Sequence, residues 1–265
     1  GEVLAAALEA GCTDVVLGIG GSATTDGGAG MLIALGAVLT DERGEPLADG
    51  GGALADLRHL ELTALCDRME GVSLVVACDV DNPLTGPRGA AAVYGPQKGA
   101  DAEQVAELDA ALAHFADLVA AHIGRDERDT PGAGAAGGVG FAGLALLGAQ
   151  LRPGVDVVFD LIGFEEAIQH ADLVITGEGS LDEQTLSGKA PAGVAAAGVR
   201  HGIPVVAVCG RTTLSREELQ GAGFETVYAL GDIEPDLQRS LTNAETLLER
   251  LGSQVAQDLH GSDRR

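Results

Sequence analysis

The residues best suited to chemistry lie in one glycine-rich segment, DVVLGIGGSATTDGGAGM (14–31). Six glycines fall within residues 18–30, together with several hydroxyls and one carboxylate, Asp26. Glycine lets backbone N–H groups approach a ligand closely, and N–H groups at a helix start bind anions. A tight strand-to-helix turn is the alternative, but the segment is too long and too polar for packing alone. We therefore predict a loop that binds phosphate or carboxylate oxygens through Gly20, Gly21, Ser22, Thr24, Gly27 and Gly28.

Two further carboxylates follow an apolar run, VSLVVA, in the segment ACDVDNPLTGPRGA (77–90). Asp79 and Asp81 thus emerge at the end of a predicted strand, where open α/β sheets bind ligands. Carboxylates this close suit Mg²⁺, which takes few protein ligands beside substrate oxygens and water. We predict that Asp79 and Asp81 are catalytic residues and metal ligands, one of them serving as general base. An Asx-type turn remains the alternative.

A third polar segment, TGEGSLDEQTLSGK (176–189), follows the apolar run DLVIT. Its spacing of glycine and lysine does not fit a P-loop. Its carboxylates, its hydroxyls (Thr185 and Ser187) and its lysine nevertheless resemble the equipment of phosphoryl transfer. We predict catalytic roles for Glu178 and Lys189 and a cofactor-binding role for Asp182. The chain's other lysine, Lys98, also lies in a glycine-flanked loop, YGPQKGA, and is predicted to contact the cofactor's phosphates.

Two other kinds of site have little support. The segment DTPGAGAAGGVGF contains a G-x-G-x-x-G pattern, but a dinucleotide fingerprint requires a preceding strand, and here polar residues and a proline precede it. The six histidines fall in helical or solvent-like contexts away from any candidate nucleophile, which disfavours a Ser-His-Asp site.

Composition narrows the class of partner. The formal net charge of −24 argues against nucleic acid and anionic membrane surfaces. The four cysteines form no metal-binding pattern and are expected to be reduced, packed thiols. No apolar run approaches the roughly 20 residues that span a bilayer. We expect a cytoplasmic protein with small-molecule partners.

Apolar patterning predicts alternating strands and helices. Short runs rich in β-branched residues predict strands at 14–19, 72–78, 155–160, 172–176, 204–209 and 226–230. Helical spacing predicts helices at 1–11, 29–38, 101–123, 140–149, 162–170, 190–201 and 240–259, with Asp101 and Gln104 as a capping box. We predict an α/β fold with a glycine-rich mixed lobe over 1–155 and a Rossmann-like parallel-sheet lobe over 156–265.

In order, GIGGSATTDGGAGM, ACDVDNPLTGPRGAA, YGPQKGA, PGAGAAGG and DLVITGEGSLDEQTLSGK resemble the motifs of the type I glycerate kinases. The resemblance runs from about residue 1 to residue 250. It implies a two-domain α/β protein that phosphorylates D-glycerate to 2-phosphoglycerate with ATP and Mg²⁺ in an interdomain cleft.

The sequence departs from that family in one respect. The family opens with a strand and an APDSFKG-like motif, for which this sequence has no counterpart. We therefore expect the sheet of the second lobe to be incomplete on its N-terminal side. An unpaired strand edge and an uncovered apolar face favour self-association, so we expect a homo-oligomer with weak or no turnover. The alternatives are a catalytically impaired protein that retains ligand binding and a nucleotide-binding, oxidoreductase-like protein.

Overall fold

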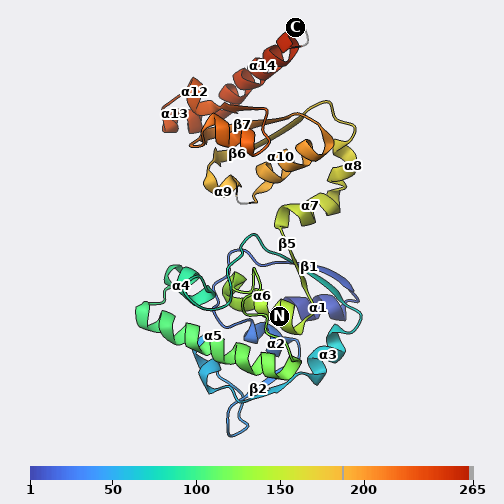
Figure 1. Cartoon of the computed structure of the whole chain (residues 1–265), viewed down its shortest axis with the longest axis vertical. Coiled ribbons are helices and arrows are strands. Elements are labelled where there is room, and N and C mark those ends of the chain that lie inside the picture. The colour runs from blue at the N-terminus through green and yellow to red at the C-terminus, as the bar shows by residue number, and fades with distance from the viewer. Residues whose placement is uncertain (187, 263–265) are drawn as a thin grey trace. The chain divides into compact units, whose positions relative to one another are not determined.

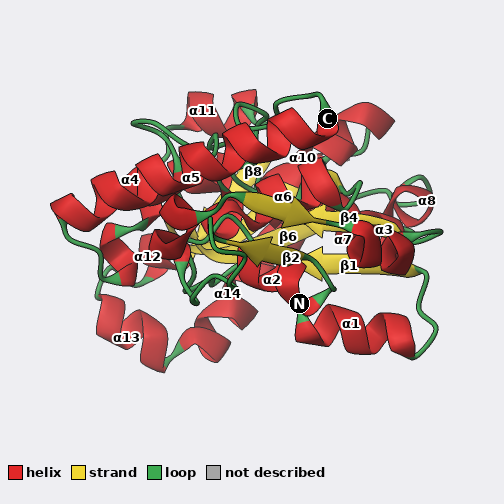
Figure 2. Ribbon diagram, turned by 90° about the horizontal axis from the view of Figure 1, so that it is seen from below, coloured by secondary structure: helices red, strands yellow, loops and turns green. Residues whose placement is uncertain are grey.

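The computed structural model describes residues 1–186 and 188–262, so Ser187 lies outside the described residues. The chain divides into two compact units, Gly1–Gly154 and Val155–Arg265. Figure 1 labels their helices and strands, and Figure 2 shows helices flanking the strands. The mixed α/β class predicted from the sequence is confirmed.

Unit 1 begins with a helix and alternates strands with helices of varied length. Its elements are α1 (Glu2–Glu9), β1 (Asp14–Gly18), α2 (Ala29–Ala34), β2 (Val38–Thr40), η1 (Gly51–Asp56), β3 (His59–Glu61), α3 (Thr63–Met69), β4 (Ser73–Ala77), α4 (Ala90–Tyr94), η2 (Pro96–Lys98), α5 (Ala102–Ile123), η3 (Ala135–Gly138), α6 (Val139–Leu146) and β5 (Gln150–Arg152).

Three parallel strands in the order β1-β4-β5 form the main sheet of unit 1. In the β1–β4 pair, Asp14 lies opposite Ser73 and Gly18 lies opposite Ala77. The two strands therefore end side by side, and the glycine-rich loop after β1 leaves the sheet beside the acidic loop after β4. The parallel β1–β4 pairing is what brings together two motifs some sixty residues apart.

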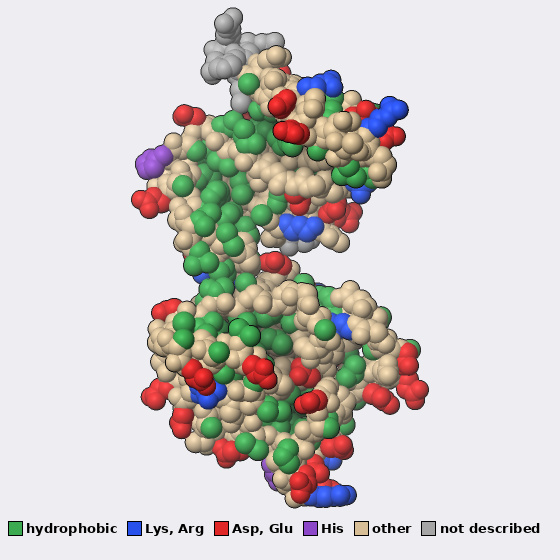
Figure 3. Space-filling model, turned by 180° about the vertical axis from the view of Figure 1, so that it is seen from behind, with side chains coloured by type: hydrophobic (Ala, Val, Ile, Leu, Met, Phe, Trp, Pro, Cys, Tyr) green, Lys and Arg blue, Asp and Glu red, His purple; other side chains and the backbone are tan. Residues whose placement is uncertain are grey.

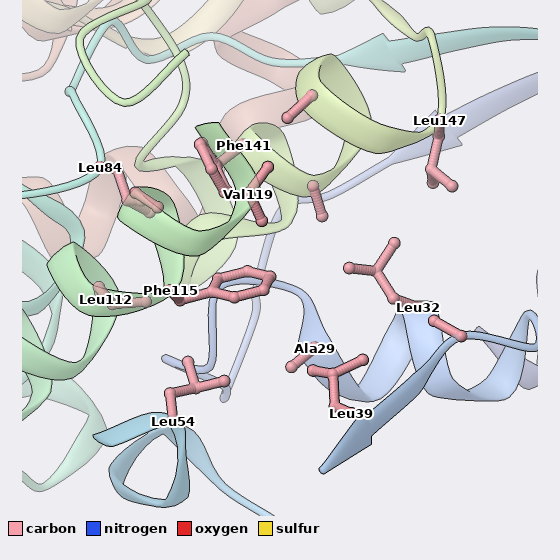
Figure 4. Close-up of a cluster of buried hydrophobic side chains, with 14 of the residues drawn as sticks. Ala29, Leu32, Leu39, Leu54, Leu84, Leu112, Phe115, Val119, Phe141 and Leu147 are labelled. Atoms are coloured by element: carbon pink, nitrogen blue, oxygen red, sulfur yellow. The ribbon is translucent and has the colours of Figure 1, made fainter. Parts of the chain in front are cut away.

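The core of unit 1 forms between α5, α2 and α6. A capping box starts α5: Asp101 accepts hydrogen bonds from the N–H groups of Glu103 and Gln104, and the Gln104 side chain accepts from Asp101 N–H. The buried face of α5 carries Phe115, which lies edge-to-face with Phe141 of α6 at a ring-centroid distance of 5.7 Å. Figure 4 shows Leu32 and Ala29 of α2 in the same cluster. Full burial of a side chain such as Phe115 stabilises the fold by roughly 2–3 kcal/mol.

Unit 2 is built on a second parallel sheet, in the order β6-β7-β8. Its elements are α8 (Phe164–Ile168), β6 (Val174–Leu181), α9 (Glu183–Leu186), α10 (Ala190–His201), β7 (Val205–Thr212), α11 (Arg216–Gly221), β8 (Thr226–Ala229), α12 (Leu230–Ile233), α13 (Leu237–Thr242) and α14 (Ala244–Ser262). Helix α10 lies in the connection from β6 to β7 and buries Ala195 and Ala197, which confirms the helix predicted at 190–201 between two strands.

Two predicted elements are wrong. The predicted strand 155–160 is part of helix α7 (Gly154–Ile162). Its apolar residues also recur at helical spacing (155, 158, 159 and 162), and Pro153 before a first turn containing Asp156 favours a helix start. The predicted helix 29–38 stops at Ala34, because Gly36 adopts φ +112° and the chain turns into β2. The short strands β2, β3 and β5 were not predicted.

Acidic side chains are spread over both units on the face drawn in Figure 3. The cysteines are all free, but Cys12 and Cys66 are exposed, so the prediction of packed thiols is wrong for these two. Among the described residues, none of the helices has both the length and the apolar composition that a membrane crossing requires.

Candidate active site

A pocket of about 260 Å³ lies in unit 1 where β1 and β4 end. Three loops form its walls: the loop after β1, the loop after β4, and the turn η3. Helix α4 and the turn η2 complete it. The lining residues of this Lys98 pocket are Ile19, Gly20, Gly21, Ser22, Ala77, Cys78, Asp79, Val80, Tyr94, Gln97, Lys98, Ala135 and Ala136. Open α/β sheets commonly bind ligands outside the carboxyl ends of parallel strands.

Lys98 is held against the glycine-rich loop. Its Nζ donates hydrogen bonds to Ser22 Oγ at 3.0 Å and to the Thr24 carbonyl at 2.5 Å. Partial burial lowers the pKa of Lys98 from its ordinary value, and the charge of Asp26 opposes that shift. An ammonium group has three donors. With two used inside the protein, one remains to meet an anionic oxygen in the pocket.

Asp79 stands in the same pocket and is fixed by a backbone group. Its Oδ1 accepts a hydrogen bond from the Gly154 N–H at 2.7 Å, where α7 begins. Within the described residues no hydrogen bond is made to Oδ2, so this oxygen is available to a ligand. Asp81, by contrast, does not line the pocket. Both of its oxygens accept from Arg88 Nη2, at 3.0 and 3.1 Å, in an exposed ion pair.

In the second half of the glycine-rich loop, the hydrogen-bonding groups are paired with other groups of the protein. Gly27 N–H donates to the Gly137 carbonyl at 2.9 Å, and Gly28 N–H donates to Asp26 Oδ1 at 3.0 Å. Asp26 Oδ2 also accepts from Gly30 N–H, at 3.0 Å, so this carboxylate caps α2. These groups fasten the loop to its neighbours, and neither Gly27 nor Gly28 lines the pocket. Their N–H groups are therefore not free to bind the anionic oxygens predicted for them.

In unit 2, the predicted residues lie on and after β6. Glu178 accepts a hydrogen bond from the hydroxyl of Thr185, which is completely buried. Asp182 Oδ1 accepts from the N–H of Gln184 at 3.0 Å, and so caps α9. Lys189 Nζ donates to Gln184 Oε1 at 3.4 Å.

A second pocket, of about 880 Å³, lies over β6 and β7 in unit 2. Glu178 and Arg211 contribute charged groups to an otherwise largely apolar lining, which includes Leu237 and Leu248 from the C-terminal helices. Asp182 and Lys189 are not among its lining residues. The structure therefore brings Ser22, Asp79 and Lys98 together in one pocket and places Glu178 in another.

Several lining residues were not predicted from the sequence. Tyr94 donates from its hydroxyl to Asn82 Oδ1 at 2.6 Å and so ties α4 to the loop after β4. Tyr94 and Gln97 shortly precede Lys98 in the segment YGPQK, and that proximity is the signal that would have found them. Ala135, Ala136 and Arg211 carry no such signal.

Across the described residues, no group of three or more His, Cys, Asp or Glu side chains is arranged to hold a metal ion. Mg²⁺ in kinases is commonly held by one or two carboxylates together with substrate phosphates and water. One carboxylate with an available oxygen, Asp79, fits that donor set.

Comparison with known proteins assigns the family. The sequence model of the glycerate kinase family matches residues 1–260. Over 256 residues the chain is 45% identical to the glycerate kinase of Bacillus subtilis (strain 168), covering 97% of this chain and 67% of that protein. It is 44% identical over 230 residues to the glycerate 2-kinase of Escherichia coli (strain K12), covering 87% of this chain and 60% of that protein. This chain belongs to the glycerate kinase family.

A solved structure supports the same fold. The crystal structure of a Salmonella typhimurium LT2 protein, assigned as glycerate kinase 2, matches with a TM-score of 0.78 at 42% sequence identity. The match covers 97% of this chain and 68% of that one. The chain thus spans about two thirds of the length of the relatives it matches.

Proposed function

We propose that this chain carries out the reaction of its family, the ATP-dependent phosphorylation of D-glycerate to 2-phosphoglycerate. The observation that carries the proposal is the Lys98 pocket. There, a lysine with one donor to spare and a carboxylate with one oxygen to spare line the same pocket at the ends of β1 and β4.

The pocket supports distinct roles for its residues. The Lys98 ammonium, the Ser22 hydroxyl and the N–H groups of Gly20 and Gly21 bind anionic oxygens of the substrate or of the transferred phosphoryl group. Asp79 Oδ2 accepts the proton of the glycerate hydroxyl while the oxygen of that hydroxyl forms a bond to the γ-phosphorus of ATP. The bond between that phosphorus and the β,γ-bridging oxygen breaks, and ADP leaves with the electron pair. Catalysis of this kind is mainly positioning and electrostatics.

Mg²⁺, when bound, would neutralise phosphate charge. The remaining lone pair of Asp79 Oδ1 would be suited to holding it while Oδ2 serves as the base. Asp81 remains a predicted second ligand and base, although its carboxylate is paired with Arg88. Glu178, Asp182 and Lys189 remain predicted contributors from unit 2, Glu178 and Lys189 to catalysis and Asp182 to ATP binding. The proposal also includes a cytoplasmic location.

A product assay tests the proposal. The chain is incubated with D-glycerate, ATP and Mg²⁺, and the products are resolved by ³¹P NMR, which separates 2-phosphoglycerate from 3-phosphoglycerate. We expect 2-phosphoglycerate and equimolar ADP from the wild-type chain and at least a hundredfold less from Asp79→Asn. The proposal is wrong if no phosphoglycerate forms and NAD, rather than ATP with Mg²⁺, protects the chain against heat.

A further inference from the structure

One residue of the Lys98 pocket has a backbone conformation that its side chain disfavours. Ala136 adopts φ +52° and ψ +39°, and among the described residues no other non-glycine residue has a positive φ. In this left-handed region the Cβ of an L-residue crowds the following carbonyl, so glycine is the residue normally found there. The segment around Ala136, GAGAAGGVG (132–140), is already rich in glycine.

The neighbouring glycines are explained by close packing. A Cβ on Gly137 would lie 2.0 Å from the Thr24 carbonyl oxygen, and a Cβ on Gly138 would lie 2.5 Å from the Cα of Gly27. Both positions press directly on the glycine-rich loop and exclude a side chain. Ala136 directly precedes these two glycines in the chain. It is half-buried and lines the pocket.

We propose that the Ala136 methyl group sets the width of the Lys98 pocket and restricts it to a three-carbon hydroxy acid. This inference rests on the proposed function, because it refines which acid the pocket accepts. The side chain persists at a strained position because it forms part of the wall that a substrate meets. Glycine would relieve the backbone and widen the pocket. Strained residues of this kind concentrate at binding sites.

The adjacent residue provides a matched control. Ala135 also lines the pocket, but it is only 2% exposed and its backbone is right-handed. Because the Ala135 side chain is almost fully buried, removing its methyl group deletes the same number of atoms from the same turn but leaves a small cavity inside the protein rather than space for a ligand. Ala135→Gly should therefore weaken the fold and leave ligand selectivity unchanged.

The experiment compares the affinities of two acids for the full chain, measured by ¹H–¹⁵N NMR titration of the pocket amides. The acids are D-glycerate and D-erythronate, which adds one CHOH unit. We expect the ratio of the erythronate Kd to the glycerate Kd to fall about tenfold in Ala136→Gly, the low end for one extra chain unit. The ratio in Ala135→Gly should stay within twofold of wild type. The Tm should rise by about 2 °C in Ala136→Gly and fall in Ala135→Gly.

Each other outcome counts against the inference. If wild type binds D-glycerate in the pocket and Ala136→Gly leaves the ratio within twofold of wild type, the methyl group is not a selectivity determinant, although the proposed function stands. If Ala136→Gly lowers the Tm, the position is not strained and the reasoning fails. If D-glycerate shifts none of the pocket amides in wild type, the proposed substrate site and this inference fall together.

Discussion

Replacing Lys98 by methionine should weaken anion binding while leaving the fold intact. The ammonium has three donors, and two of them serve Ser22 Oγ and the Thr24 carbonyl. The variant therefore removes one charge-assisted hydrogen bond to a ligand, a bond in the range of about 1.5–3 kcal/mol. Because the side chain is only half-buried, solvent screening places the loss near about 1.5–2 kcal/mol. That corresponds to a Kd for D-glycerate raised about 10- to 30-fold.

Isothermal titration calorimetry at fixed ionic strength measures this change. Arg43→Met, which removes an exposed cation from the same unit, is the control for net charge and should change the Kd less than twofold. Loss of the two internal hydrogen bonds should lower the Tm of Lys98→Met by a few degrees. A Kd within twofold of wild type would refute the role given to Lys98.

The same residue predicts a pH dependence. The protonated ammonium holds the anion, so affinity is present below the Lys98 pKa and is lost as pH rises through it. Since burial lowers that pKa from the ordinary lysine value of 10.5, the loss should begin at a lower pH than for an exposed lysine. Lys98→Arg, which stays charged, should bind more weakly than wild type but keep its affinity across that alkaline range. If wild type and Lys98→Arg lose affinity over the same alkaline range, the group that titrates is not Lys98.

Three further outcomes follow from the same geometry. Asp79→Asn should lower turnover at least about a hundredfold with little change in Tm, whereas Asp81→Asn, outside the pocket, should have a smaller effect in the same coupled assay. Gly154→Pro removes the N–H that holds Asp79 and should lower kcat, while Gly154→Ala, whose Cβ would lie 3.4 Å from the carboxylate oxygens, should not. Asp101→Ala removes the α5 capping box and should destabilise the chain by about 1 kcal/mol in urea unfolding, with D-glycerate affinity unchanged.

The long, periodic elements were predictable because their signals are local. The α5 helix has an apolar stripe at helical spacing and a capping box at Asp101, and both were found where the sequence predicts them. Strands β1, β4, β6, β7 and β8 are short β-branched runs bounded by glycine or polar residues. Residues 155–160 carry the same β-branched signal, yet they form α7, since four- to six-residue apolar runs fit either period. The three-residue strands β2, β3 and β5 depend on tertiary pairing, which no local pattern encodes.

The candidate site was predictable in its parts and not in its assembly. The glycine-rich loop, Asp79 and Lys98 were each marked by residue type, and the ends of β1 and β4 bring them together. Sequence did not distinguish Gly20 and Gly21, which line the pocket, from Gly27 and Gly28, which pack inside the protein. Glycine serves close approach to a ligand and close approach of two loops equally well, so only the three-dimensional packing separates these uses.

The proposed binding of anions by the backbone of the glycine-rich loop suits the strong negative charge of the chain. A protein with net charge −24 repels anionic substrates at long range, and within a Debye length of about 8 Å that repulsion is little screened. Additional lysines or arginines would attract the surrounding carboxylates, as Arg88 does with Asp81. Backbone N–H groups also supply positive potential. Because they are fixed in the main chain, they cannot turn away from the ligand to pair with a neighbouring carboxylate, as a flexible cationic side chain can. One half-buried lysine, anchored by Ser22 and Thr24, adds the single formal charge that the glycine loop lacks.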